Sequence, residues 1–322
     1  MLAAFAARLD PTDPVAAFEV GEQPEAAPPA GRPDWAVVEV RAATLNHHDL
    51  WSLRGVGLPA ERLPMILGTD AAGVGPDGSA VLVHCLLGAT GHGMGPTEQR
   101  SILSERYPGT LAERVAVPAW NLVPLPAELS FAEAACLPTA WLTAYRMLFT
   151  SAGLRPGDRV LVQGVGGGVA SAAITLGAAA GLEVVATSRD PAKRERAVAM
   201  GAVAAVSPGE RTPFRVDAVI ETVGAATWAH SIRALRPGGT VVVAGATSGD
   251  QPGAELSRVF FTELRVVGAT LGGRDDLVAL LRFLVRSGVR PVVDSTFALA
   301  DARAAMARLA SGEHTGKVVV LP

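Results

Sequence analysis

The sequence predicts a two-domain α/β protein, with a mostly β first domain and a second domain built on a doubly wound parallel sheet. Its 322 residues are more than one hydrophobic core usually holds. Before residue 130 the apolar runs resemble antiparallel strands, whereas after it strands and helices alternate, as in a parallel sheet. We expect residues 1–139 and 272–322 to form the first domain and residues 140–271 the second.

The composition narrows the class of protein. Half the residues are apolar and Gly and Pro are plentiful, which fits a compact α/β protein, and the net charge of −3 argues against a nucleic-acid partner. We find no convincing signal peptide and no apolar window of about 18 residues, so we expect a cytoplasmic protein without a membrane association. In that reducing compartment Cys85 and Cys136 are expected to be free thiols.

The first region contains three expected strands. Residues 35–45 alternate apolar and polar side chains, as a half-buried strand does. A Pro-rich connection over residues 22–34 precedes them, and a Gly-rich irregular stretch covers residues 88–110. The other two strands are expected at residues 78–89 and 110–118.

Regular alternation of helices and strands begins at residue 130. Ser130 is expected to cap a long helix, because Glu133 three residues later completes a capping box. The later strands are expected at residues 158–164, 183–188, 217–224, 239–246 and 265–272, and helices at residues 168–181, 190–202 and 275–288, before a last helix and a closing strand within residues 297–322.

A glycine-rich turn follows the first of these strands. In "VLVQGVGGGVASAAI" the spacing is Gly164-x-x-Gly167-x-x-Ala170, a variant of the dinucleotide-binding motif. Glycines there let a pyrophosphate approach the start of the following helix closely. The alternative is a tight turn without a ligand. The residues expected at the cofactor are Gly164, Gly166, Gly167, Gly168 and Val169.

The end of the second strand of this series favours NADPH as the cofactor. Ser188, Arg189 and Lys193 offer a hydroxyl and two cations, which suit a 2′-phosphate. Asp190 is the competing interpretation, as an acid that would bind the ribose of NAD. Because it precedes Pro191, we expect Asp190 to cap the next helix instead.

Several segments together resemble one known family. They include "AATLNHHDLWSLRG", "PMILGTDAAG", "LTAYRML", "PGDRVLVQGVGGGVA" and "EHTGKVVV". Nearly the whole chain resembles the medium-chain dehydrogenase/reductase superfamily, and within it the zinc-independent quinone oxidoreductases, the zeta-crystallin-like group. The resemblance implies a GroES-like catalytic domain and a Rossmann cofactor domain. Residues 84–107 match no pattern of that group, so the substrate stays open.

The resemblance also locates three positions at which zinc-dependent relatives carry metal ligands. These positions hold Asn46, Thr69 and Thr139, whose neutral oxygen groups are poor zinc ligands beside thiolate and imidazole. We therefore expect no metal. Cys136 is an alternative as a shifted ligand. The other candidate ligands are His47, His48, Asp70, His84, Cys85 and His92, and the alternative is that all of these are ordinary polar side chains. His47 and His48 are adjacent and are expected to point apart on a strand.

Hydride transfer from NADPH to quinones or α,β-unsaturated carbonyls is the implied activity. Asn46, Thr69 and Thr139 would donate hydrogen bonds to the developing oxyanion, His48 would pass a proton, and Asp49 would orient the site. Simple packing is the alternative for His48, and a structural role is the alternative for Asp49. The resemblance also implies cofactor contacts from Thr143, Lys317, Val223, Gly245, Ala246, Thr247, Thr270 and Leu271, although Thr143 could serve its own helix and Lys317 could be a surface cation.

Other functions remain open at this point. They are a zinc-type alcohol dehydrogenase with atypical ligands, a tailoring reductase for a specialised metabolite, and a non-catalytic NADPH-binding protein. The apolar strand at residues 265–272 suggests a homodimer, because an edge strand can pair with its twin across a two-fold axis. The expected substrate is a small molecule.

Overall fold

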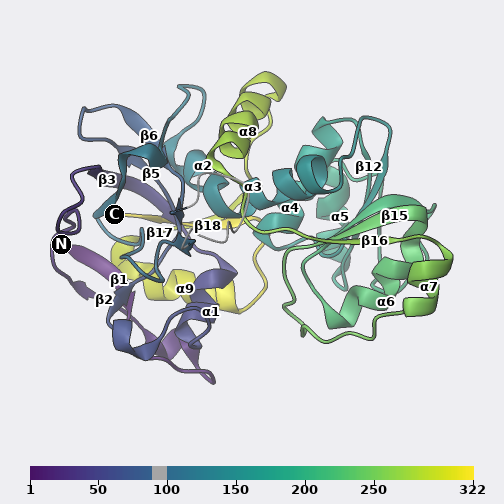
Figure 1. The fold of residues 1–322 in the computed structure, drawn as a ribbon, viewed down its shortest axis with the longest axis horizontal. Coiled ribbons are helices and arrows are strands. Elements are labelled where there is room, and N and C mark those ends of the chain that lie inside the picture. The colour runs from purple at the N-terminus through teal and green to yellow at the C-terminus, as the bar shows by residue number, and fades with distance from the viewer. Residues whose placement is uncertain (89–99) are drawn as a thin grey trace. The chain divides into compact units, whose positions relative to one another are not determined.

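The computed structural model describes residues 1–88 and 100–322, which form two compact units (Figure 1). Unit 1 comprises Met1–Ala140, Gly272–Arg286 and Val293–Pro322, and unit 2 comprises Trp141–Leu271 and Ser287–Val292. The expected fold class is confirmed, with a mainly β unit and a unit built on a parallel sheet. Among the described helices, none is long and apolar enough to cross a membrane.

Unit 1 is built around one large, mainly antiparallel sheet. Its strands follow the order β10-β6-β5-β3-β18-β17, and β9 also pairs with β3. The closing strand β18 lies between β3 and β17, antiparallel to the first and parallel to the second. The bounds are β3 Trp35–Thr44, β5 Asp70–Val74, β6 Ala80–Val83, β9 Arg114–Pro118, β10 Leu122–Pro124, β17 Val293–Ala298 and β18 Lys317–Leu321.

Smaller elements of unit 1 complete it. A three-stranded sheet has the order β2-β1-β4, and β7 pairs with β8. The run at residues 78–89 is not one strand, because His84 and Cys85 interrupt it between β6 and β7. The bounds are β1 Leu2–Ala6, β2 Phe18–Glu22, β4 Met65–Ile66, β7 Leu86–Leu87, β8 Ser101–Ile102, α8 Arg274–Ser287 and α9 Ala302–Ala310.

Helix α1, His47–Leu53, corrects one expectation from the sequence. His47 and His48 lie at the start of this helix and not on a strand. The helix begins here because the Asp49 side chain accepts a hydrogen bond from the backbone N–H of Asn46, at 2.8 Å. An early acidic residue also complements the positive end of the helix dipole.

The helical run after residue 130 begins as expected. Ser130 N donates to Glu133 Oε2 at 2.8 Å and Glu133 N donates to Ser130 Oγ at 3.3 Å, so the capping box is confirmed. The run is not one regular α-helix, however. α2 (Phe131–Ala135) and α3 (Leu142–Tyr145) are each followed by wider π-helical turns, at Leu137–Trp141 and Arg146–Ser151.

Unit 2 contains the parallel sheet, in the order β13-β12-β11-β14-β15-β16. Helices α4, α5 and α6 lie alongside it (Figure 1). Buried apolar residues of β11, β12, β14 and β15 form its core together with Ile232 of α6 and Leu264. The bounds are β11 Arg159–Val162, β12 Glu183–Thr187, β13 Ala204–Val206, β14 Val216–Glu221, β15 Leu235–Val243, β16 Arg265–Gly268, α4 Gly168–Ala179, α5 Pro191–Ala199, α6 Ala225–Ala234 and α7 Leu256–Phe261.

Candidate functional site

A buried ion pair is the centre of a polar cluster in unit 1. The Lys317 ammonium donates to Asp70 Oδ2 at 3.1 Å, to Asn46 Oδ1 at 2.5 Å and to the carbonyl of Leu45 at 2.8 Å, so all three of its protons are used. The Lys317 side chain is 2% exposed and that of Asp70 is fully buried. The same Asp70 oxygen accepts from Thr44 Oγ1 at 2.7 Å. The alternative that Lys317 is a surface cation is therefore wrong.

The three positions assigned to metal ligands in zinc-dependent relatives come together in this cluster. Asn46 Nδ2 donates to Asp70 Oδ2 at 2.8 Å and to Thr69 Oγ1 at 3.1 Å. Thr69 Oγ1 and Thr139 Oγ1 share a hydrogen bond at 2.9 Å. Asn46 and Thr69 are buried and Thr139 is half-buried. The arrangement is a hydrogen-bonded chain that runs from Asn46 to the Thr139 hydroxyl, which also lies 3.8 Å from the Cys85 thiol.

Asp49 ties two parts of the cluster together. Its carboxylate is fully buried and accepts from the backbone N–H groups of Asn46, at 2.8 Å, and Gly68, at 2.9 Å. Burial raises the pKa of Asp49, although these hydrogen bonds oppose that effect. Gly68 has a φ of +95°, and a Cβ there would meet backbone and side chain of neighbouring residues. Asp49 thus fixes the turn before Thr69 as well as the start of α1.

His48 lies near the cluster and pairs with a carboxylate. Its Nε2 is 3.0 Å from Glu105 Oε1, and the two side chains are 24% and 31% exposed. Burial alone would lower the pKa of His48, but the hydrogen bond with Glu105 and the charges of Asp49 and Asp70 raise it overall. The pairing with Glu105 therefore favours the protonated form of the His48 imidazole.

The side chains considered as alternative zinc ligands are engaged otherwise. His84 Nε2 is 3.0 Å from the carbonyl of Gly272, and burial lowers the pKa of His84. Burial raises the pKa of Cys85 and of Cys136 to about 12, which favours neutral thiols. Across residues 1–88 and 100–322 no group of three or more His, Cys, Asp or Glu side chains could hold a metal ion. His92 lies outside the described residues.

The glycine-rich turn of unit 2 is a cradle open to a ligand. Gly164 has a φ of +96°, and its N–H donates to Thr187 Oγ1 at 3.1 Å. Thr187 in turn donates to Gln163 Oε1 at 2.8 Å, which fixes the turn between two strands. A Cβ on Gly167 would meet nothing within 4 Å, so the space beside the start of α4 is free. Gly166, Gly168 and Val169 complete this turn and the start of α4.

The end of β12 is shaped by the start of α5. Asp190 is the N-cap of α5 and accepts from a backbone N–H at 2.8 Å, which confirms its expected role. Arg194 donates to the carbonyls of Ser188, at 2.8 Å, and Arg189, at 3.3 Å. These contacts of Arg194 were not predicted from the sequence, although its position in the first turn of α5 could have indicated them. Arg189 is exposed and Lys193 is half-buried.

A buried carboxylate orders the turn after β14. Glu221 is fully buried and accepts from the N–H groups of Val223, at 2.8 Å, and Gly224, at 3.0 Å, and from the hydroxyls of Thr227 and Ser231. This network could not be predicted from the sequence, because the partners of Glu221 are up to ten residues away from it. The other expected cofactor residues are Thr143, which is buried in α3, and Gly245, Ala246, Thr247, Thr270 and Leu271, which follow β15 and β16 at the carboxyl edge of the sheet.

Models of two protein families match parts of this chain. Residues 32–127 match the alcohol dehydrogenase GroES-like domain, and residues 168–286 match zinc-binding dehydrogenase. NorB, a spectinabilin polyketide synthase system protein of Streptomyces orinoci, is 32% identical over 92% of this chain, but the chain spans only 13% of NorB.

Two solved structures cover nearly the whole chain. An NAD-dependent alcohol dehydrogenase is 32% identical, with 100% of both chains covered and a TM-score of 0.88. The 2-octenoyl-CoA carboxylase reductase CinF, in complex with NADP and 2-octenoyl-CoA, is 26% identical, with 99% of this chain and 87% of that chain covered and a TM-score of 0.85.

Proposed function

The chain belongs to the medium-chain dehydrogenase/reductase superfamily, and on that premise we propose that it is an NADPH-dependent, zinc-independent reductase of α,β-unsaturated carbonyl compounds or quinones. One observation carries the proposal. The three positions at which zinc-dependent relatives carry ligands hold an amide and two hydroxyls, joined in one hydrogen-bonded chain. The assignment to the quinone oxidoreductase group rests on the sequence resemblance alone.

Zinc does not fit this set of side chains. Amide and hydroxyl oxygens are weak zinc ligands, and all three positions lack a thiolate, imidazole or carboxylate. The Lys317 ammonium is 2.5 Å from Asn46 Oδ1, so the oxygen of that amide already faces a cation. We therefore derive no step that uses a metal, although the matching family model is described as zinc-binding.

NADPH does fit the cradle in unit 2. Gly164, Gly167 and the start of α4 would hold the pyrophosphate, because the space is open and the first N–H groups of α4 have no carbonyl partner in the helix. Ser188, Arg189 and Lys193 would hold the 2′-phosphate. When bound, the cofactor supplies the hydride.

The direction of the hydrogen-bonded chain supports Thr139 as the donor to the substrate oxygen. Asn46 donates to Thr69, so Thr69 Oγ1 acts as an acceptor there. If Thr139 donated to Thr69, the Thr69 proton would be buried without a described acceptor, which costs about 1–3 kcal/mol. Thr69 is therefore the donor to Thr139. The other described contact of the half-buried Thr139 hydroxyl is a long, weak one with the Cys85 thiol at 3.8 Å, so a substrate oxygen would compete well for the Thr139 proton and a developing enolate would be stabilised by it.

Reduction of a conjugated double bond also needs a proton at the second carbon. His48 would supply it, because Glu105 stabilises the protonated imidazole. A plain ketone would react poorly, since hydrogen bonds alone activate it less than a metal ion does. The CinF structure contains 2-octenoyl-CoA, an α,β-unsaturated thioester, and this similarity favours that substrate class over quinones.

We also propose that the protein forms a homodimer. β16 is an outer strand of the parallel sheet in the described chain, and its Val266 is 53% exposed. Leu256, Phe260 and Phe261 of the preceding α7 are each at least 61% exposed. Pairing of two copies along β16 would cover this apolar surface. Sedimentation at micromolar concentration should give twice the chain mass, and a monomer would contradict pairing.

The test of the proposed activity is NADPH oxidation by chelator-treated protein. Enones, enoyl thioesters and 1,4-benzoquinone should be reduced, and a plain ketone should not. Thr139→Val should lower kcat/KM by roughly 10²–10³-fold, because it removes one oxyanion donor, while the affinity for NADPH stays unchanged. Thr12→Val, at an exposed site, is the matched control. Loss of activity on chelation with recovery on adding zinc would overturn the proposal.

A further inference from the structure

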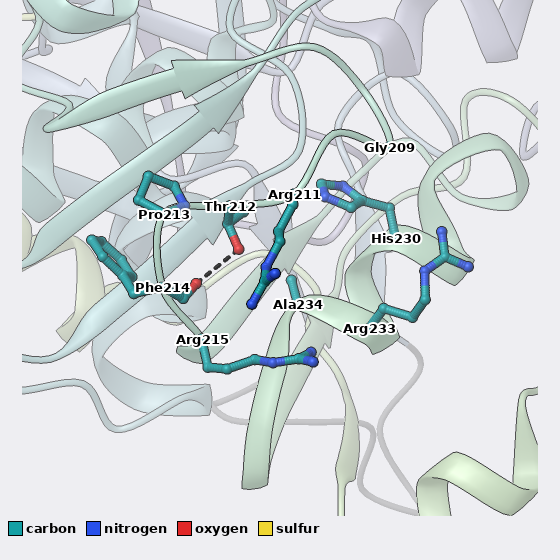
Figure 2. A pocket seen from close by; sticks show the side chains of 9 residues that line it. All are labelled: Gly209, Arg211, Thr212, Pro213, Phe214, Arg215, His230, Arg233 and Ala234. Atoms are coloured by element: carbon teal, nitrogen blue, oxygen red, sulfur yellow. Dashed lines mark hydrogen bonds between the residues drawn. The ribbon is translucent and has the colours of Figure 1, made fainter.

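A cationic cavity lies in unit 2, outside the residues assigned to the cofactor. Its volume is about 240 Å³, and one wall is the connection between β13 and β14, with the other formed by the second half of α6 (Figure 2). The lining residues are Gly209, Arg211, Thr212, Pro213, Phe214, Arg215, His230, Arg233 and Ala234. Three of them are arginines and none is acidic.

The three guanidinium groups have no protein partner in the described part of the chain. No hydrogen bond or ion pair joins the side chains of Arg211, Arg215 or Arg233 to residues 1–88 or 100–322, and all three are exposed at the cavity. Figure 2 shows Arg211 and Arg215 extending toward Ala234 from the connecting segment. Elsewhere in unit 2, Arg159 pairs with Glu183 and Arg236 with Asp217. Three unpaired cations around one hollow create a positive potential that an anion would neutralise.

Hydrogen bonds and packing contacts hold the walls of this cavity in place. His230 is 7% exposed, and its Nδ1 accepts from Gln163 Nε2 at 3.1 Å, so its Nε2–H donates to the carbonyl of Glu210 at 2.8 Å. At the other end, Phe214 packs against the core of the sheet and the Arg159 guanidinium lies 4.5 Å from its ring centroid. The segment that carries Arg211 is thus anchored on both sides, which lowers the entropy cost of binding.

We propose that this cavity is a binding site for a phosphate group, separate from the cofactor site. Arginine forks bind phosphate oxygens in pairs, and a phosphate dianion matches several unpaired guanidinium groups better than chloride or a single carboxylate does. The volume of about 240 Å³ is below that of a typical drug-sized ligand site. It suits inorganic phosphate, pyrophosphate or the phosphate end of a larger molecule.

Calorimetric titration of pyrophosphate into NADPH-saturated protein, at constant ionic strength, tests the proposal. One pyrophosphate should bind per chain. Arg211→Gln with Arg215→Gln should weaken binding roughly tenfold or more, since each removes a charged hydrogen-bond donor. The control is Arg196→Gln with Arg303→Gln, which removes two exposed arginines that do not line the cavity and should leave pyrophosphate binding unchanged.

Titration with ADP identifies the source of the phosphate group. Tighter binding of ADP than of pyrophosphate, lost in the Arg211/Arg215 variant, assigns the cavity to the phosphate end of a nucleotide, and weaker binding assigns it to a free phosphate. The variant should bind NADPH as the wild type does. Absent pyrophosphate binding, equal binding by wild type and variant, or displacement of NADPH by pyrophosphate would each overturn the proposal.

Discussion

Replacing Lys317 by Met tests whether the buried ion pair holds unit 1 together. The substitution keeps an unbranched side chain of similar length but removes the ammonium and its hydrogen bonds to Leu45, Asn46 and Asp70. Asp70 then remains a fully buried carboxylate without its cation. Breaking a buried pair from one side costs about 3–5 kcal/mol. For a unit of this size the loss corresponds to a decrease in Tm of roughly 6–20 °C.

Urea unfolding followed by tryptophan fluorescence measures this loss. Trp35, Trp51 and Trp120 lie in unit 1 and report on its unfolding. A second substitution, Asp70→Asn, removes the buried charge that Lys317→Met leaves behind. The double variant should therefore be more stable than Lys317→Met alone, with a coupling free energy of about 1–3 kcal/mol. Additive effects of the two substitutions, or a loss below about 1 kcal/mol for Lys317→Met, would refute the reasoning.

Three further predictions concern protons and the cofactor. Glu105→Gln should lower the pKa of His48, measured by NMR titration. Because the pKa of His48 is raised in the folded state, the His48–Glu105 pair stabilises the fold fully below the ordinary histidine pKa, and this stabilisation is lost as the pH rises through the raised value. An unchanged pKa of His48 in the Glu105→Gln variant would contradict the pairing. Asp294→Asn should lower the free energy of unfolding by about 1.5–3 kcal/mol at pH 7, measured by thermal unfolding, because hydrogen bonds to Asp294 depress the pKa of its carboxyl despite the effect of burial. The difference from wild type should shrink on acidification below about pH 4. A difference that does not depend on pH would contradict the prediction. Arg189→Gln should raise the KM for NADPH roughly tenfold but not that for NADH in steady-state assays, and equal effects on both would remove Arg189 from the 2′-phosphate site.

The order of elements in unit 2 could be predicted because local signals coincide there. Apolar runs, the glycine-rich turn and the cap at Asp190 each specify structure over a few neighbouring residues. The three-residue strand β13 was missed because so short a run carries no periodicity. Helix α1 was not predicted. The residues of its capping contact, Asn46 and Asp49, lie in a segment that looks in the sequence like an ordinary polar stretch.

The candidate site could be predicted only in part, because its residues depend on tertiary contacts. The motifs identified Asn46, Thr69 and Thr139, and the structure brings their side chains together. They could not indicate that Lys317, which lies 247 residues after Asp70, donates to that carboxylate. The buried partners of Glu221 were missed for the same reason.

The insertion of β18 between β3 and β17 has a consequence for biosynthesis. Residues 141–271 of unit 2 leave the ribosome before β18 does, so the parallel sheet can assemble while unit 1 still lacks a strand. Until Lys317 emerges, the edge of β3 near Thr44 is unpaired and Asp70 has no counter-ion. During this interval the nascent chain carries an incomplete unit 1 with an unpaired strand edge, and protection by chaperones would then matter most.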